Sequence, residues 1–347
     1  MSSRFAVPAN ASYDDPLPFE CVTDPNLAMS LVLYAIQAAY LLFGAVLNFL
    51  IVHTIFKSKK GVYRQNSFYL LYTADAIVGI YINLSELLIG RLFLFVTPLC
   101  PIVTPHFFTP SILFKFYYAA VHYSSGFKTV SQIFLSLNRM TCVIWPLKHV
   151  RIWRTVLKPV LVALFVLPFG VIWNILISRV YLNPNGAGFS VNYKDRIAWA
   201  NVSLLHLGYS VVGFVLVVVT FIVTIVGLLM MERRVKDTER SLTVATLLMA
   251  VQMVLFVAIQ IYFAFFAAAT PSLRSVLLLS VVVIYDSMNV SSPVALILMS
   301  RQLRADVFHL KPDDTTAVAS RSVSTVSHQQ PPAFRAISSV VAPTVPL

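Results

Sequence analysis

The chain has 347 residues, of which 58% are hydrophobic and 12% are charged, and its formal net charge is +12. A typical soluble domain is about 45–50% apolar and about 25% charged, so this composition excludes a soluble globule and indicates an integral membrane protein. The basic residues cluster between apolar runs, as membrane topology requires, without zinc-type cysteine spacing or aromatic-basic interleaving, so no nucleic-acid partner is expected.

Seven apolar runs follow along the chain, and each reaches the roughly 20 residues that a helix needs to cross a bilayer. They cover residues 29–56, 67–90, 112–145, 158–180, 200–230, 241–268 and 273–299. The sequence therefore predicts an all-α membrane protein with a seven-transmembrane helix bundle at 29–300. An extracellular N-terminal segment (1–28) precedes it, and a cytoplasmic tail (301–347) is expected to be disordered.

The distribution of Lys and Arg predicts the orientation of the bundle. The segments after the first, third and fifth runs, together with the tail, hold 18 of these residues, and the opposite side holds six. By the positive-inside rule the N-terminus is outside and the C-terminus inside, as in a multi-pass protein of the plasma membrane. Residues 1–28 contain no apolar core of a cleavable signal, so the first helix should act as its own insertion signal.

The outer side carries two expected modifications. Asn10 lies in "NAS", a glycosylation acceptor. Cys21 and Cys100 are the two cysteines on this oxidising side and are predicted to form a disulfide, whereas Cys142 should be reduced. The bridge would close a loop of about 80 residues and stabilise the protein by about 4 kcal/mol in the chain-entropy model. Other "N-x-S" triplets lie in or too near predicted helices and are read as chance matches: Asn83, Asn201 and Asn289.

Ionisable residues lie inside three of the predicted helices, where each costs several kcal/mol unless it is paired or hydrated. They are Asp75, Lys128 and Asp286. With a helical rise of about 1.5 Å per residue, their depths in the bilayer are compatible, so we expect Lys128 to pair with Asp75 or Asp286. Such a pair either holds the bundle together or rearranges when helices move. Glu86 and Lys115 lie nearer the outer surface and are expected to snorkel.

A polar stripe follows one face of the third predicted helix. Its members have the spacing i, i+4, i+7, i+11 that shares a face: Lys128, Gln132, Leu135 and Arg139. The stripe ends with Arg139 at the inner mouth of the bundle, within reach of water and of a cytoplasmic partner. Asp286, Asn289 and Pro293 form a similar pattern on the seventh helix, where Asn and Pro predict a hydrogen-bonded kink.

The segment "NRMTCVIWPL" resembles the motif of rhodopsin-type G protein-coupled receptors in which Asp-Arg-Tyr is followed by a Pro-Leu pair. Arg139 takes the place of the arginine, and Pro146 and Leu147 take the place of the pair. Asn48 in "LNFLIV" and Asp75 in "LYTAD" match the Asn and Asp of the first two helices of such receptors.

A narrower resemblance covers residues from about 28 to 305. "FLSLNRMTCVIWPLKHVRIW" and "LPFGVIWNILISR" resemble the nematode serpentine chemoreceptors of the Srg, or class gamma, group. The chain departs from the rhodopsin-type pattern because Asn138 replaces the acid, the seventh helix reads "SSPVAL" and the sixth has no Trp-x-Pro. The second outer loop, 181–199, has no cysteine for the rhodopsin-type disulfide, and the seventh helix has no lysine for a retinal Schiff base.

The resemblance implies a receptor that binds a small molecule among its helices and activates a heterotrimeric G protein. Its coupling residues would be Asn138, Arg139, Pro146 and Leu147. Its buried polar core would be Asn48, Asp75, Lys128, Gln132, Asp286, Asn289 and Pro293. Candidate ligand-lining residues on the outer half of the third helix are Tyr117, His122 and Tyr123. They suit an apolar or mildly polar molecule, although the same side chains are equally good packing.

Membrane lipid is the remaining expected partner. The sequence shows no nucleophile–base pair or metal-ligand spacing, so we expect no enzymatic activity, no cofactor and no metal. A ligand-gated channel or transporter is the alternative function. Transporters usually contain internal repeats, and we find no convincing repeat between the two halves. Insect-type odorant channels also have seven helices but place the N-terminus inside, against the charge distribution.

Overall fold

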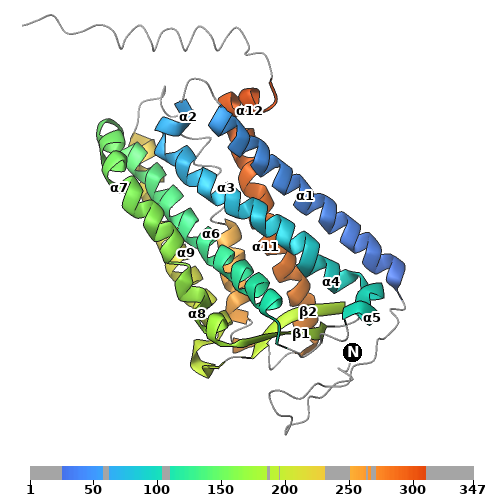
Figure 1. Cartoon of the computed structure of the whole chain (residues 1–347). Coiled ribbons are helices and arrows are strands. Elements are labelled where there is room, and N and C mark those ends of the chain that lie inside the picture. The colour runs from blue at the N-terminus through green and yellow to red at the C-terminus, as the bar shows by residue number, and fades with distance from the viewer. Residues whose placement is uncertain are drawn as a thin grey trace, which may run out of the picture.

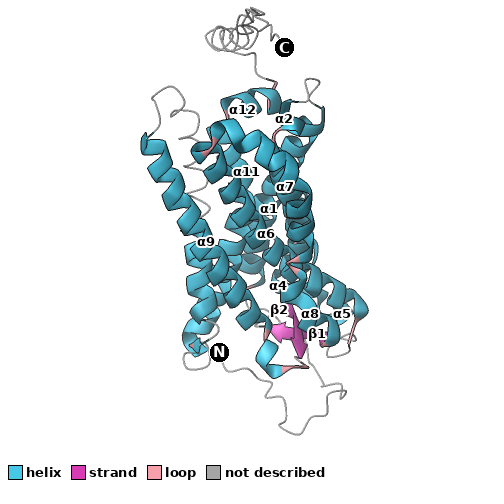
Figure 2. Cartoon of the chain, turned by 90° about the vertical axis from the view of Figure 1, so that its left-hand side faces the viewer, coloured by secondary structure: helices cyan, strands magenta, loops and turns pink. Residues whose placement is uncertain are grey.

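The computed structural model describes residues 26–57, 62–103, 110–185, 188–194, 196–230, 251–262, 265–266 and 271–309. Long helices dominate this part of the chain and run side by side along one axis (Figures 1 and 2). The predicted glycosylation site Asn10, Cys21, and the tail from residue 310 lie outside the described residues. The long helices are α1 (Leu27–Lys57), α3 (Ser67–Ser85), α6 (Ile112–Ile144), α7 (Pro146–Val166), α9 (Val202–Met230) and α11 (Pro271–Met299).

Shorter elements extend or join these helices. The π-helix η1 and then α4 continue α3, and α8 continues α7. The sixth apolar run is described in part, as a helix over Val251–Tyr262. The shorter elements are α2 (Val62–Gln65), η1 (Glu86–Arg91), α4 (Leu92–Phe95), η2 (Thr97–Leu99), α5 (Cys100–Val103), α8 (Phe169–Ile177), β1 (Arg179–Asn185), β2 (Gly188–Lys194), η4 (Ala198–Ala200) and α12 (Arg301–Val307).

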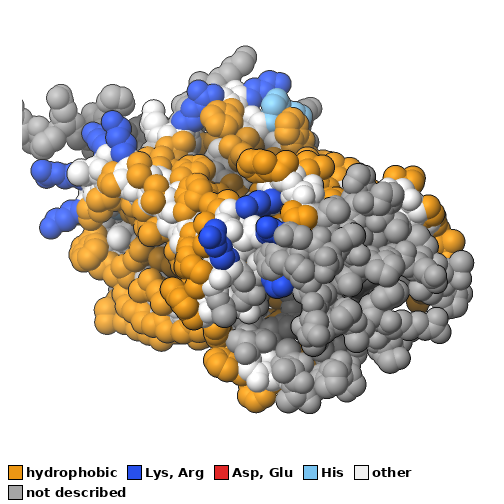
Figure 3. Space-filling model, turned by 60° about the horizontal axis from the view of Figure 1, so that its bottom comes forward, with side chains coloured by type: hydrophobic (Ala, Val, Ile, Leu, Met, Phe, Trp, Pro, Cys, Tyr) orange, Lys and Arg blue, Asp and Glu red, His pale blue; other side chains and the backbone are white. Residues whose placement is uncertain are grey.

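Four helical stretches of the described chain are long and apolar enough to cross a membrane. They are Leu27–Lys57, Ser67–Phe95, Pro146–Ile177 and Val202–Met230. α6 is also long, with 33 residues, but it carries the predicted polar stripe, and all four members of that stripe are buried. Large apolar side chains cover much of the outside of the bundle, as the orange surface in Figure 3 shows. This pattern is expected of a protein whose helices are surrounded by lipid.

The connection between α6 and α7 differs from the prediction. We expected a polar loop before a helix starting at residue 158, but α7 begins at Pro146. Proline suits the first position of a helix because its missing N–H would have no intrahelical partner there. Trp153 then turns into the bundle and donates its Nε1–H to Thr141 Oγ1 at 2.8 Å. Residues 146–157 are therefore helical and packed against α6.

The connection between α8 and α9 contains a two-stranded hairpin that the sequence analysis did not predict. β1 and β2 are antiparallel, with Arg179 opposite Lys194 and Asn185 opposite Gly188. The hairpin lies at one end of the bundle (Figure 1), which we call the hairpin end. Val180, Leu182 and Phe189 are buried there against α6 and the α4–α5 region.

α12 and α2 lie at the opposite end of the bundle (Figure 2), which we call the α12 end. Residues 301–307 were expected to belong to a disordered tail, but they form a helix because Leu303 and Val307 are buried in the core there. The Tyr63 hydroxyl of α2 donates to Asp306 Oδ2 at 2.5 Å. Burial and this carboxylate raise the pKa of Tyr63 above its ordinary value.

Candidate functional site

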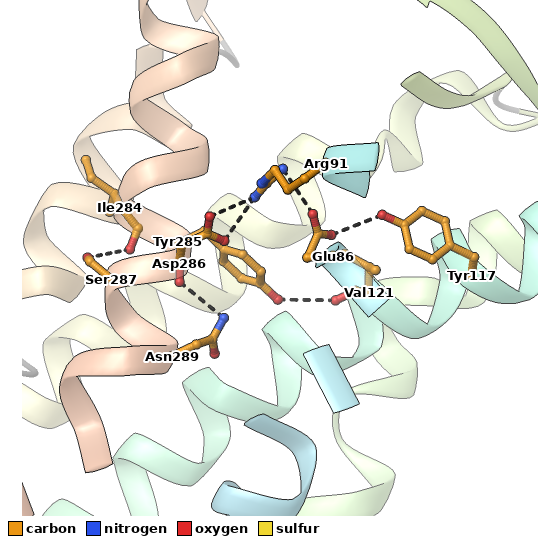
Figure 4. A network of polar contacts seen from close by, with 9 residues as sticks. All are labelled: Glu86, Arg91, Tyr117, Val121, Ile284, Tyr285, Asp286, Ser287 and Asn289. Carbon is orange, nitrogen blue, oxygen red and sulfur yellow. Dashed lines mark hydrogen bonds and ion pairs between the residues drawn. The ribbon is translucent and has the colours of Figure 1, made fainter. Parts of the chain in front are cut away.

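Three charged side chains form a buried cluster in the hairpin half of the bundle (Figure 4). Arg91 donates to both carboxylate oxygens of Asp286, at 2.9 and 3.1 Å, and lies 3.0 Å from Glu86 Oε2. The Tyr117 hydroxyl donates to the other Glu86 oxygen at 3.2 Å. Arg91 and Asp286 are 5% and 3% exposed. This three-charge cluster (Glu86, Arg91 and Asp286) joins the extension of α3 to α11 and, through Tyr117, to α6.

A π-helix brings Glu86 and Arg91 together. In an α-helix, residues five apart point about 140° away from each other, because one turn takes 3.6 residues. The η1 segment has π-helical hydrogen bonding from residue i to i+5, which brings its first and last residues to one side. Gly90 provides space, because a Cβ there would meet the Glu86 carboxylate and lie 2.6 Å from the Tyr117 hydroxyl. Single π-turns are rare and often occur at functional sites.

A second ionic contact lies on the α12 side of the three-charge cluster along α3. Lys128 Nζ is 2.7 Å from Asp75 Oδ2 and donates to the Asp75 backbone carbonyl at 3.0 Å. We call Asp75 and Lys128 the Lys128 pair; both are buried. A Cβ at Gly79 would lie 3.1 Å from Lys128 Nζ and 3.2 Å from Asn48 Nδ2. The glycine therefore lets both polar side chains approach α3.

These contacts confirm one prediction and correct two others. Asp75 is the partner of Lys128, which was one of the two expected pairings. Asp286, the other expected partner, pairs with Arg91 instead. Glu86 does not snorkel to the surface, because its carboxylate forms an ion pair with Arg91 inside the bundle. Arg91 was one of the six basic residues counted on the outer side, and the sequence did not identify it as the partner of Glu86 and Asp286. The available signal was the segment "ELLIGRLFLF", in which opposite charges five apart interrupt an apolar run.

Further polar side chains are buried between the two ionic sites. Asn48, Asn83 and Asn289 are at most 1% exposed. Within the described residues, Asn48 Nδ2, both amide atoms of Asn83, Asn289 Oδ1 and Asp75 Oδ1 have no hydrogen-bond partner. Each such group costs about 1–3 kcal/mol when it is unpaired and buried. Within the described residues, the polar atoms between α1, α3 and α11 are thus not all paired with protein groups.

The remaining predicted core residues lie inside α6 and α11. Gln132 is buried on α6, and Asn289 Nδ2 donates to the Tyr285 carbonyl at 3.2 Å (Figure 4). Pro293 lies within α11, where it removes one backbone donor. The Asn–Pro pattern of the sequence thus falls inside one continuous helix.

At the α12 end, Asn138 and Arg139 attach α6 to the start of α3. Asn138 Nδ2 donates to Ser67 Oγ at 2.7 Å, and the Arg139 guanidinium carbon lies 3.7 Å from the Phe68 ring centroid. We expected Arg139 within reach of water, but it is 8% exposed because it stacks on this ring. A cation held over an aromatic face is attracted to it, more strongly when desolvated. Leu147, by contrast, is fully exposed at the start of α7.

The candidate ligand-lining residues all make contacts within the protein. Tyr117 contacts Glu86, as described above. The rings of His122 on α6 and His206 on α9 share a hydrogen bond of 2.9 Å between Nδ1 and Nε2. Tyr123 donates to the Phe165 carbonyl of α7 at 2.7 Å. Tyr117 and His122 thus lie between helices of the bundle, while Tyr123 fastens α6 to α7.

The predicted modifications are tested in part. Cys100 is disulfide-bonded, and the Cys142 thiol is not part of a disulfide; the pairing of Cys100 with Cys21 stays a proposal. Asn83 and Asn289 are buried inside helices, in agreement with their exclusion as glycosylation sites.

Membrane-length apolar helices around a buried ionic core define a helical integral membrane protein. The family model described as Srg family chemoreceptor matches residues 34–307. The chain therefore belongs to the Srg family.

Proteins of Caenorhabditis elegans are similar to this chain over most of its length. It is 62% identical to serpentine receptor class gamma-10 over 90% of this chain and 96% of the relative. For serpentine receptor class gamma-20 the identity is 54%, over 90% of this chain and 91% of the relative. For serpentine receptor class gamma-13 the identity is 46%, over 94% of this chain and 97% of the relative. These relatives are named as serpentine receptors, in agreement with the family match.

Proposed function

We propose that the protein is a chemosensory receptor of the plasma membrane that binds a small molecule within a bundle of seven helices and activates a heterotrimeric G protein. The hairpin end faces outward, and the α12 end faces the cytoplasm, as the distribution of Lys and Arg indicates. A ligand that favours one helix packing shifts the population toward that packing by its differential affinity.

The observation that carries this proposal is the three-charge cluster. One guanidinium holds two carboxylates that come from different parts of the bundle, and Tyr117 adds α6 to the same contact. A small molecule with polar groups that binds in this half competes with these hydrogen bonds. Any exchange of partners changes how η1, α6 and α11 are held together.

The other end of the same helices supplies the coupling region. α6 continues from Tyr117 to Asn138 and Arg139, which are held by Ser67 and Phe68 at the start of α3. A relative movement of α3 and α6 would separate Arg139 from the Phe68 ring and expose a cation. A heterotrimeric G protein on the cytoplasmic side would then bind the opened end.

The decisive experiment measures second-messenger responses to a ligand panel in cells that express the full chain. We expect an activating compound for the wild-type receptor, and no response from Arg139→Ala at comparable surface expression. Lys148→Ala is the matched control, because Lys148 is an exposed basic residue near the same end of α6 and α7. The control should respond like the wild type.

Two results would overturn the proposal. A normal response of Arg139→Ala would reduce Arg139 to an anchor for membrane topology. A ligand-gated ionic current that persists when G proteins are inhibited would instead identify a channel.

A further inference from the structure

A cavity of about 240 Å³ opens at the hairpin end, between the start of α6 and the junction of α8 with β1. Its polar lining consists of two cations, Lys115 and Arg179, and two hydroxyls, those of Ser111 and Ser178. None of the described residues that line it is acidic. Figure 3 shows this end of the molecule, where blue basic side chains stand beside an orange apolar surface. The cavity therefore favours a negatively charged group.

Two of the polar groups are available to a ligand. Within the described part of the chain, Lys115 forms no ion pair. Ser111 precedes α6, and its hydroxyl makes no capping hydrogen bond to that helix. Ser178, by contrast, is fixed, because its hydroxyl accepts the Arg196 backbone N–H at 3.1 Å. Lys115 and Ser111 thus supply donors, and Ser178 supplies a rigid wall.

The depth of Lys115 matches the headgroup region of a bilayer. Lys115 precedes Lys128 by 13 positions on the same helix, which corresponds to about 20 Å. With Lys128 near the midplane, Lys115 lies at the level of the polar headgroups, which begin about 15 Å from the midplane and end about 20–22 Å from it. Trp199, 73% exposed at the same end, is of the residue type enriched at this boundary.

The surroundings of the cavity are those of a lipid-facing surface. On α6, Ile112 and Phe116, which flank Lys115 in the sequence, are 75% and 69% exposed. On α8, Leu176 is also exposed, just before the junction that lines the cavity. A molecule bound here meets cations at the headgroup level and exposed apolar side chains next to them. This combination fits an amphiphile.

We propose that the cavity binds the phosphate group of a phospholipid in the outer leaflet, with Lys115 as the principal cation and Arg179 as the second. The acyl chains follow the exposed apolar surface of α6 and α8. The choice of leaflet rests on the orientation given under the proposed function, but the binding itself does not. Because Ser178 and Arg179 begin the hairpin connection, a bound lipid would hold that connection against α6.

The test uses purified full-length protein in detergent and native mass spectrometry. Phosphatidylglycerol is titrated, and the first tightly bound lipid is counted. Diacylglycerol, which lacks the phosphate, and inorganic phosphate, which lacks the chains, serve as separate probes. We expect phosphatidylglycerol to bind at least about tenfold more tightly than diacylglycerol, because a charge-assisted hydrogen bond contributes that much or more. It should also bind at least about tenfold more tightly than inorganic phosphate, because burial of the acyl chains contributes about 0.8 kcal/mol per CH₂ group.

Variants assign the site. Lys115→Gln combined with Arg179→Gln should weaken phosphatidylglycerol binding by about tenfold. Lys115→Arg should retain binding, and this variant guards against a general loss of fold. Arg196→Gln is the matched control, because Arg196 is an exposed cation of the same end that does not line the cavity.

Each alternative outcome overturns the assignment. Equal loss in Arg196→Gln would show that general positive charge attracts the lipid. Equal binding of diacylglycerol would show that the phosphate is not recognised. Equal binding of inorganic phosphate would make the cavity a site for free anions. Since no signalling is measured, these results are independent of whether the chain activates a G protein.

Discussion

The Lys128 pair and the three-charge cluster are both buried, but they balance charge differently. In the Lys128 pair, one ammonium faces one carboxylate, and both belong to regular α-helical positions of α3 and α6. In the three-charge cluster, two carboxylates share one guanidinium, so the formal charge of the group is −1. The pair is formally balanced in itself, whereas the cluster contains one more carboxyl group than cations.

The difference indicates different roles. A neutral buried pair between two helices can hold them in a fixed register without further partners. The three-charge cluster depends on a π-turn, on the missing side chain of Gly90 and on a hydroxyl from α6. It therefore has more ways to change partners. We expect the Lys128 pair to act mainly in stability and the three-charge cluster mainly in the response to ligand.

The largest effect should come from Arg91→Met. The change leaves the carboxylates of Glu86 and Asp286 buried without their cation, and breaking a buried ionic contact in this way costs about 3–5 kcal/mol. We expect a strong fall in the unfolding midpoint of the purified protein and in surface expression. Arg196→Met, at an exposed position, should change neither by much. A wild-type midpoint for Arg91→Met would mean that the cluster is hydrated and contributes little.

Lys128→Met should destabilise the protein by a similar or slightly smaller amount, about 3–5 kcal/mol. The two sites differ in how they can be rescued. Adding Asp75→Asn to Lys128→Met removes both charges, and replacing a whole buried pair is often close to neutral. Adding Asp286→Asn to Arg91→Met still leaves Glu86 without a cation. Unfolding midpoints should therefore recover in the first double variant more than in the second; equal recovery would contradict the difference in charge balance.

The sequence predicted the parts of this site that follow α-helical periodicity. The shared face of Lys128, Gln132, Leu135 and Arg139 follows from their spacing, and the burial of Lys128 with a carboxylate follows from its depth. The depths did not decide between Asp75 and Asp286, and Arg139 was expected within reach of water. These predictions need two numbers, the residues per turn and the rise per residue of an α-helix, and the rule that charges in lipid are paired.

The three-charge cluster could not be predicted in that way. Glu86 and Arg91 share a side only because the chain adopts a π-turn, and residues five apart do not meet on an α-helix. The helical start at Pro146 was missed for a related reason. The basic residues that follow Pro146 suggested a loop. The segment is helical because Trp153 is buried against the bundle, and this burial depends on tertiary contacts.

Gly90→Ala tests the geometry of the three-charge cluster without changing its charge. The new methyl group would meet the Glu86 carboxylate and the Tyr117 hydroxyl, and such overpacking typically costs about 1–3 kcal/mol. Gly208→Ala is the matched control, because nothing lies within 4 Å of its Cβ position. Alanine there should be neutral or stabilising, since glycine within a helix is less favourable than alanine by about 1 kcal/mol. Equal midpoints for the two variants would show that Glu86 can move freely, and that the cluster is looser than its distances indicate.

The smallest effect should come from Tyr117→Phe, which removes one donor to Glu86 and keeps the ring. The bond is 3.2 Å long, beyond the usual 2.5–3.0 Å of O–H···O hydrogen bonds, so we expect a loss of about 1 kcal/mol. Tyr118→Phe controls for the loss of a tyrosine hydroxyl at the next position of α6. If the three-charge cluster responds to ligand, Tyr117→Phe should change the ligand concentration for half-maximal response although its unfolding midpoint moves little. Loss of stability with unchanged ligand sensitivity would instead assign the three-charge cluster the same structural role as the Lys128 pair.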